Sequence, residues 1–175
     1  MYLFITRFST PYTAILLLSF ILLAGCGQSD DQREFEREAF AAPDGFTKTT
    51  NGVDIESEDP DDWRISPFYQ GLVDIEAPAY PNPVETSDQV RIENFNRDQA
   101  VTRLRTIVWF AEEGFEQDVP SGNYDNLESN SITTISINPR ELSRFDNPES
   151  WVGLKRVILL DQDGNVISYG DIMVE

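Results

Sequence analysis

Short runs of alternating apolar and polar residues fill the chain from residue 65 to residue 175, with Pro, Gly and Asn between them. An alternation with a period of two puts apolar side chains on one face of a β-strand. Several short strands at this spacing, with no long helical pattern among them, are typical of two antiparallel sheets. The pattern therefore predicts an all-β fold, an antiparallel β-sandwich, over residues 65–175.

Six of these runs have the length and composition of strands. We expect strands at residues 70–75, 89–95, 103–110, 131–137, 154–160 and 166–174. Pro78, Pro81 and Pro83 are expected to end the first strand, because proline lacks the N–H that a strand ladder needs. Asn138 and Pro139 predict the start of a short helical turn that reaches Leu142.

The last two strands form the clearest predicted hairpin. The residues between them are Asp161-Gln162-Asp163-Gly164-Asn165. Glycine and asparagine tolerate the positive φ angles of tight turns, so we expect a left-handed backbone conformation near Gly164.

One motif in this half of the chain resembles a known class of β-domain. Tyr80-Pro81-Asn82-Pro83, followed by the alternating strand at Val90, resembles the opening of immunoglobulin-like modules in type IX sorting domains and in the flagellar hook-capping protein. Gly153 and Gly164 stand where such modules have glycines near their last strands. The resemblance implies an immunoglobulin-like β-sandwich. The last residues, Val174 and Glu175, differ from the basic residues that often follow a sorting domain, so we carry over the fold and not the sorting role.

The first 26 residues resemble the signal of a bacterial lipoprotein. Arg7 precedes an apolar run over residues 14–23, and Leu23-Ala24-Gly25-Cys26 has the form of a lipobox. The run is shorter than the roughly 20 apolar residues that a transmembrane helix needs. The resemblance implies that residues 1–25 are removed as a signal peptide and that the Cys26 thiol carries a lipid. Gly27, in place of an aspartate, implies a lipid-anchored location in the cell envelope at the outer membrane.

Residues 26–64 are acidic and poor in aliphatic side chains. Such a composition buries too little apolar surface to offset the entropy of ordering the chain. We therefore expect a lipidated tether that is largely disordered and presents the β-domain. Within it, Phe35 and Ala39 are four residues apart, a spacing that allows a helical turn or two.

Composition excludes several classes of function. The chain has no histidine and one cysteine, so it lacks the commonest general base, the usual zinc ligand and any disulfide. With 31 acidic against 13 basic residues, its net charge of −18 gives no support for binding nucleic acid. We therefore expect no cofactor, no metal and no nucleic-acid partner.

Two groups of mostly acidic residues are candidate sites. Glu112, Glu113, Glu116 and Asp118 could supply the paired carboxylates of a glycosidase, although a solvated turn is the simpler interpretation in so acidic a chain. Asp161, Asp163 and Asn165 alternate like the start of a calcium loop. Val166 and Ile172 stand where that loop needs glycine and a bidentate glutamate, which favours a plain hairpin turn.

The sequence thus predicts a membrane-anchored envelope lipoprotein that is not an enzyme and has a binding or assembly role toward an envelope protein. The alternative is an envelope carbohydrate-active enzyme using paired carboxylates. A groove lined by aromatic residues between two acids would favour the enzyme, whereas an open sheet edge or a flat apolar patch would favour the binding role. Seven aromatic residues could contribute to a partner patch or to the core: Trp109, Phe110, Phe115, Tyr124, Phe145, Trp151 and Tyr169.

Overall fold

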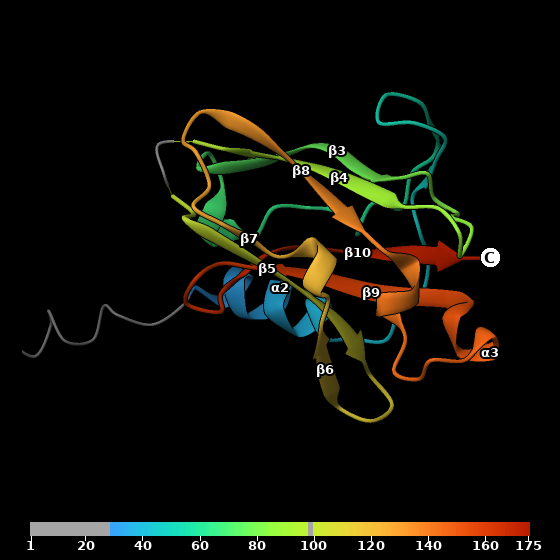
Figure 1. Ribbon diagram of the computed structural model, residues 1–175. Coiled ribbons are helices and arrows are strands. Elements are labelled where there is room, and N and C mark those ends of the chain that lie inside the picture. The colour runs from blue at the N-terminus through green and yellow to red at the C-terminus, as the bar shows by residue number, and fades with distance from the viewer. Residues whose placement is uncertain (1–28, 98–99) are drawn as a thin grey trace, which may run out of the picture. The chain divides into compact units, whose positions relative to one another are not determined.

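Antiparallel strands make up most of the regular secondary structure in the computed structural model, which describes residues 29–97 and 100–175 (Figure 1). Residues 31–175 form one compact unit. The predicted signal peptide and Cys26 lie outside the described residues. Among the helices of the described part, none has the length and apolar character needed to cross a membrane.

Three strands form the first sheet, in the order β3-β4-β8. These are β3 (Val73–Tyr80), β4 (Val90–Asn96) and β8 (Ser131–Ile137). Both neighbouring pairs are antiparallel. The predicted run 131–137 coincides with β8. The prediction for the first strand was wrong at both ends, because β3 starts later and continues through Pro78. A proline is tolerated there since β3 lies at the sheet edge and its pairing with β4 is irregular.

The second sheet has the order β10-β9-β5-β6, and Figure 1 shows it below the first. Its strands are β5 (Arg103–Phe110), β6 (Phe115–Asp118), β9 (Gly153–Leu160) and β10 (Val166–Val174), and the short β7 (Tyr124–Asp125) also pairs with β5. Strand β5 coincides with the predicted run 103–110. The β9–β10 hairpin is confirmed, and Gly164 in its turn has a φ of 85°.

One hydrophobic cluster takes side chains from both sheets. The alternating residues of each strand supply them, as the period of two requires. Members from the first sheet include Val90, Ile92, Ile135 and Ile137, and members from the second include Leu104, Val108, Val157, Leu159 and Ile172. All nine are at most 1% exposed, so this cluster is the main core.

The residues before β3 are ordered, and the prediction of a largely disordered tether is wrong for residues 30–64. They form α2 (Asp30–Ala39), β1 (Lys48–Thr49) and β2 (Ile55–Ser57). Phe35 and Ala39 of α2 pack into a second hydrophobic cluster with residues of β5, β9 and β10. The expected helical turns are therefore present, and they extend the folded unit below residue 65. The physical reason is that a highly charged helix still buries a narrow apolar stripe.

The segment that follows covers the edge of β10. The Trp63 N–H donates to the Tyr169 carbonyl at 2.7 Å, and the Ser66 N–H donates to the Ile167 carbonyl at 2.9 Å. Gly170 permits this approach, because a Cβ there would lie 2.3 Å from the Trp63 ring. The edge of β10 is consequently not available to another chain along these residues.

Short helical turns complete the described structure. They are η1 (Pro67–Tyr69), η2 (Pro120–Gly122), η3 (Pro139–Leu142) and α3 (Pro148–Trp151). The predicted turn through Leu142 is confirmed as η3, and the Asn138 side chain caps it by accepting from the Arg140 N–H at 3.1 Å.

Candidate binding surface

The four carboxylates considered as catalytic residues lie on the hairpin that joins β5 to β6, and two of them are bound by one arginine. The Arg105 guanidinium lies 3.1 Å from the Glu116 carboxylate and 2.5 Å from that of Asp118. Glu113 is 3.7 Å from Arg144. Arg105 therefore neutralises Glu116 and Asp118 on β6. Glu112 and Glu113, in the turn between β5 and β6, make no contact with Arg105 among the described ion pairs.

Glu112 and Glu113 line a hollow of about 360 Å³ with Trp109, Pro43 and Lys155. The Lys155 ammonium donates to the Ser150 carbonyl at 2.9 Å, and burial lowers the pKa of Lys155. Glu116 and Asp118 do not line this hollow. The structure thus divides the predicted carboxylate set and does not gather it around one cavity.

The acidic turn at Asp161 binds its own backbone. The Asp161 Oδ1 accepts from the N–H groups of Asp163 and Asn165, both at 2.8 Å, and Oδ2 accepts from the Asn165 side chain and the Tyr69 hydroxyl. Burial would raise the pKa of Asp161, but these hydrogen bonds hold it below its ordinary value. The carboxylate organises the hairpin turn. In the described part of the chain, no three acidic or thiol groups are placed to hold a metal ion.

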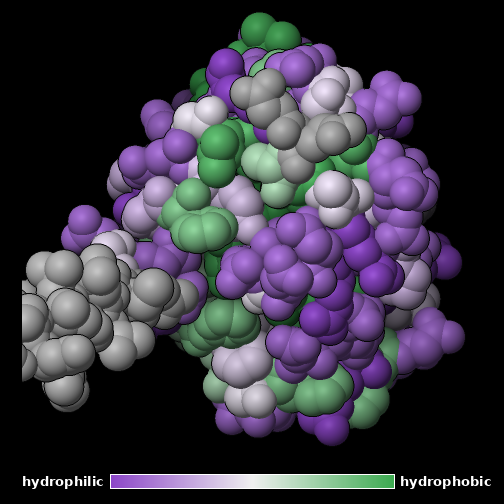
Figure 2. Space-filling view, turned by 90° about the vertical axis from the view of Figure 1, so that its left-hand side faces the viewer, coloured by the Kyte–Doolittle hydropathy of each residue, from purple (hydrophilic) through white to green (hydrophobic). Residues whose placement is uncertain are grey.

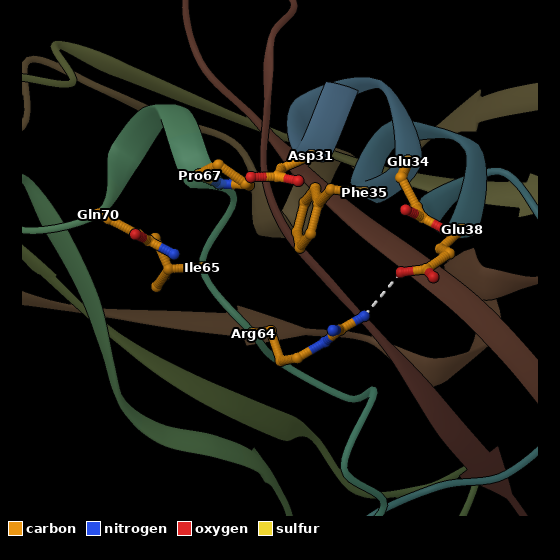
Figure 3. Close-up of a pocket in the computed structure, with 8 residues that line it drawn as sticks. All are labelled: Asp31, Glu34, Phe35, Glu38, Arg64, Ile65, Pro67 and Gln70. Carbon is orange, nitrogen blue, oxygen red and sulfur yellow. Dashed lines mark hydrogen bonds and ion pairs between the residues drawn. The ribbon is translucent and has the colours of Figure 1, made fainter. Parts of the chain in front are cut away.

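A second hollow, of about 550 Å³, lies beside α2 (Figure 3). Asp31, Glu34 and Glu38 of the helix line it together with Phe35, and Arg64 lies opposite. Figure 3 shows the Arg64 side chain reaching toward Glu38, and their charged groups are 2.8 Å apart. This ion pair joins α2 to the segment before β3. The hollow therefore lies where these two parts of the chain pack against each other.

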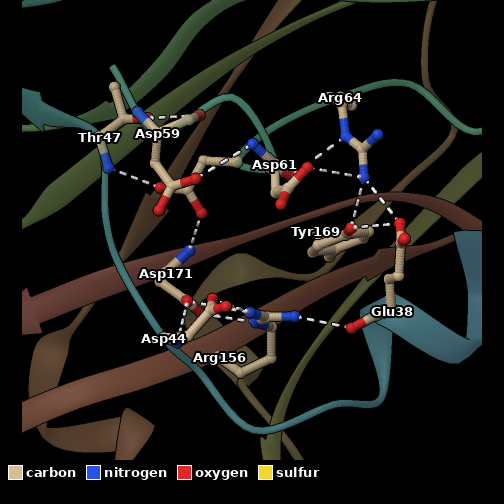
Figure 4. A network of polar contacts seen from close by, with 10 residues as sticks. Glu38, Asp44, Thr47, Asp59, Asp61, Arg64, Arg156, Tyr169 and Asp171 are labelled. Atoms are coloured by element: carbon tan, nitrogen blue, oxygen red, sulfur yellow. Dashed lines mark hydrogen bonds and ion pairs between the residues drawn. The ribbon is translucent and has the colours of Figure 1, made fainter. Parts of the chain in front are cut away.

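A buried polar network holds the same segment to β10 (Figure 4). Arg156 and Asp171 form a two-pronged ion pair, with Nη2 and Oδ2 at 2.9 Å and side chains 4% and 2% exposed. The Arg156 guanidinium also donates to the Glu38 carbonyl at 2.8 Å. Through this network, the second sheet binds the end of α2.

Asp62 adds a further link in this network. Its carboxylate accepts from the Asp171 N–H at 2.8 Å and from the Thr47 N–H at 2.6 Å. Burial raises the pKa of Asp62 to about 7, although both N–H donors act in the opposite direction. Asp62 therefore joins β10 to Thr47, the residue before β1, and its pKa lies near neutral pH.

The outer edge of β8 is open. The Ser136 N–H donates away from β4 to the Tyr124 hydroxyl at 3.0 Å, and the Asn138 N–H donates to the Ser121 hydroxyl at 3.0 Å. Because backbone direction alternates along a strand, the N–H groups of Thr134 and Ile132 also face this outer side. Within the described residues, β4 is the one strand paired with β8, and these two outward N–H groups have no partner.

Beside this edge, a third hollow of about 630 Å³ lies against the first sheet. Its lining residues come from the β1–β2 loop and from β3, β4 and β8: Asn51, Gly52, Val53, Asp54, Glu76, Ala77, Tyr80, Glu93 and Ile132. Val53 is 89% exposed and Ile132 is 54% exposed. We call the outer edge of β8 at Ile132 and Thr134, together with this hollow, the β8 docking surface.

The hydrogen bond that Tyr80 donates to Glu93, at 2.6 Å, orients two side chains of this hollow. That bond and burial raise the pKa of Tyr80. The free part of β8, at Ile132 and Thr134, has no charge, no proline and no bulge against β4, which are devices that usually protect an edge strand. Sequence reasoning did not single out this edge. The uncharged run of Ser, Ile and Thr in so charged a chain was the available signal.

Elsewhere the surface is mostly polar. Figure 2 shows one face of the molecule, on which hydrophilic side chains form broad areas and hydrophobic ones lie in smaller patches between them. Among the predicted partner aromatics, Tyr169 is buried in the second hydrophobic cluster, whereas Phe115 and Phe145 are exposed beside Arg144.

Comparison with protein-family models, with curated proteins and with solved structures found no match to this chain.

Proposed function

We propose that this chain is a lipid-anchored, non-catalytic binding component of the bacterial cell envelope, which holds a partner protein at the β8 docking surface. The observation that carries the proposal is the open, uncharged edge of β8, where two backbone N–H groups face outward without partners. A row of free backbone groups is a template for a strand from another chain.

The strand order supports an immunoglobulin-like sandwich. Counting β3, β4, β5, β6, β8, β9 and β10 as seven successive strands, the first sheet has the order 1-2-5 and the second has the order 7-6-3-4. An immunoglobulin constant domain pairs its fourth strand with its fifth. Here the fourth strand, β6, pairs with β5 in the other sheet. That switch is why β8, the fifth strand, has an unoccupied edge.

The division of the acidic residues supports binding over hydrolysis. A glycosidase needs two carboxyl groups facing each other across one substrate site. Arg105 binds Glu116 and Asp118, and neither lines the hollow that contains Glu112 and Glu113. The carbohydrate-active alternative therefore has no pair of acids from both sides of the hairpin in a common cavity.

The anchor rests on the lipoprotein resemblance at Cys26. Several acyl chains on one residue hold a folded domain on a bilayer, where a single chain gives only marginal binding. Confinement to the outer membrane raises the effective concentration of a partner in the same layer, so a modest affinity at β8 suffices. Cys26→Ala is expected to leave a longer precursor without lipid, which mass spectrometry of the amino terminus detects.

Site-specific crosslinking in the protein's own cells tests the binding role. A photoreactive residue is placed at Thr134 on the open edge and, as the matched control, at Glu149 on α3. We expect Thr134 to give one recurrent protein adduct, identified by mass spectrometry, and Glu149 not to give it. Equal adducts from both positions, or none from Thr134, would refute the proposed function.

A further inference from the structure

We infer that the segment bound at the β8 docking surface is an extended strand with basic side chains on the face that looks toward Glu93. The inference rests on the proposed function, since it takes β8 as the binding edge. It adds the chemistry of the partner, which the backbone edge alone does not specify.

The backbone fixes the form of the partner. Ile132 and Thr134 offer outward N–H groups two residues apart, which is the repeat of a strand ladder. At one end, the Tyr124 hydroxyl already occupies the N–H of Ser136. The free edge is therefore short, and it matches the backbone groups of an extended segment of about four or five residues.

Side chains on the outer face of the sheet select the partner's residues. Glu93 of β4 lies directly opposite Thr134, and Phe95 lies directly opposite Ile132. Adjacent strands are about 4.8 Å apart, so a strand added to β8 would run about 10 Å from β4. A lysine or arginine side chain on its outer face spans that distance to the Glu93 carboxylate.

The charge around the hollow favours a basic partner. Asp54, Glu76 and Glu93 line it, no basic residue does, and within the described residues none of the three acids forms an ion pair. Arg91 of β4 lies opposite Ser136 in the strand register, beyond the free part of the edge. Arg97 is bound to Asp74. Complementary charge raises both selectivity and association rate at such a surface.

A second copy of this chain is the less favourable occupant. Each copy carries a net charge of −18, and a paired β8 would supply no basic residue to either hollow. Two copies joined at this edge would instead bring two acidic hollows together, and like charges oppose that association. The observations therefore favour a different chain of opposite charge.

Designed peptides test this inference on the full chain purified in detergent. The first peptide alternates Val and Thr with lysine on one face. The second has glutamate in place of lysine. The third repeats the lysine peptide with N-methyl groups on the backbone N–H groups that would face β8. Fluorescence anisotropy is expected to show about tenfold tighter binding of the lysine peptide than of the glutamate peptide, and a loss of binding on N-methylation.

Three variants locate the site. Thr134→Pro removes an outward N–H without removing a bond to β4, and we expect it to abolish binding. Glu93→Gln should weaken the lysine peptide about threefold to tenfold and leave the glutamate peptide no weaker. Glu149→Gln, on α3 and remote from β8, should change the affinity of neither peptide. Circular dichroism checks that each variant keeps its β-structure.

Each contrary result has a distinct meaning. Failure of every peptide to bind, binding that survives Thr134→Pro, or equal binding of both charges would overturn the inference. A dimer in sedimentation that Thr134→Pro dissolves would assign the edge to a second copy and overturn it as well. If crosslinking at Thr134 succeeds in cells while lysine confers no preference, the inference fails and the proposed function stands. If the lysine peptide binds while crosslinking at Thr134 fails in cells, the proposed function fails, and only the preference of the β8 edge for a basic strand stands.

Discussion

The ion pair of Arg156 and Asp171 is buried beneath the segment before β3, and its two charges depend on each other. Removing one charge leaves the other desolvated, which costs far more than losing an exposed ion pair. We expect Asp171→Asn to lower the free energy of unfolding by about 3 kcal/mol. As the control, Asp118→Asn breaks an exposed ion pair with another arginine, Arg105, and should lower the free energy of unfolding by less than about 1 kcal/mol. Denaturant unfolding measures both, and equal losses would contradict this account.

Asp62 predicts a dependence of stability on pH. Burial raises the pKa of Asp62 to about 7 in the folded chain, from 3.8 in a solvated one. The unfolded chain therefore releases its proton at lower pH, and the contribution of Asp62 to stability is full below about pH 4 and is lost as the pH rises to 7. Its neighbours Asp171 and Asp59 strengthen this tendency.

Melting temperatures between pH 4 and pH 8 test the role of Asp62. The chain should lose stability across this window by an amount on the order of 1 to 4 kcal/mol. Asp62→Asn, which carries no titrating proton, should have a flatter profile, and the exposed Asp61→Asn should follow the unaltered chain. A profile in Asp62→Asn as steep as in the parent would rule Asp62 out as the cause.

These residue contacts could not be predicted from the sequence. Asp62 and Asp171 look like any other acids in a chain rich in them, and 109 residues separate the two that hydrogen-bond. The hairpin turn at Asp161 was predictable, because Val166 and Ile172 do not fit the spacing of a calcium loop and a plain turn is the simpler interpretation. Burial and long-range partners, which decide pKa, are set by the folded arrangement.

Helix α2 shows how a polar segment contributes to a core. Phe35 is 6% exposed and its ring centroid lies 5.0 Å from that of Tyr169 on β10. We expect Phe35→Ala to lower the free energy of unfolding by about 3 kcal/mol or more, through lost burial and the cavity left behind. Phe68→Ala, at a residue 62% exposed, is the matched control and should cost less than about 1 kcal/mol.

Limited proteolysis gives an independent readout at the same scale. Residues 30–64 should resist cleavage together with the strands, and Phe35→Ala should expose them. Rapid cleavage of this segment in the unaltered chain would show instead that residues 30–64 are a disordered tether.

The strands differ in how far the sequence could predict them. Alternation alone located β5 and β8 correctly, because one face of each strand lies in the main core, whereas the other face meets α2 in β5 and solvent in β8. Strand β3 was misplaced because Pro78 argued against a strand, and only the sheet order shows that β3 is an edge where proline fits. Residues 30–64 were misread because average composition hides two apolar residues placed four apart. The open edge of β8 follows from pairing, which alternation does not specify.

For the whole molecule, the excess of acidic residues sets a repulsive background. The chain has 31 Asp and Glu against 13 Lys and Arg. Its surface ion pairs, such as Lys48 with Glu56 and Arg103 with Asp125, are exposed and individually weak. Salt screens attraction and repulsion alike, and in this chain repulsive pairs are in the majority. The balance predicts that screening stabilises the fold.

We therefore expect the melting temperature to rise by a few degrees between about 0.01 M and 1 M sodium chloride, as the Debye length falls from about 30 Å to about 3 Å. Glu58→Gln, which removes an exposed acid that has no ion pair among the described residues, should raise the melting temperature at low salt and reduce the gain from salt. Asp125→Asn, which also breaks the contact with Arg103, should give a smaller rise. Potassium chloride should act as sodium chloride does, because screening depends on ionic strength and not on a bound cation. A melting temperature that falls with added salt would show instead that the surface ion pairs outweigh the repulsion.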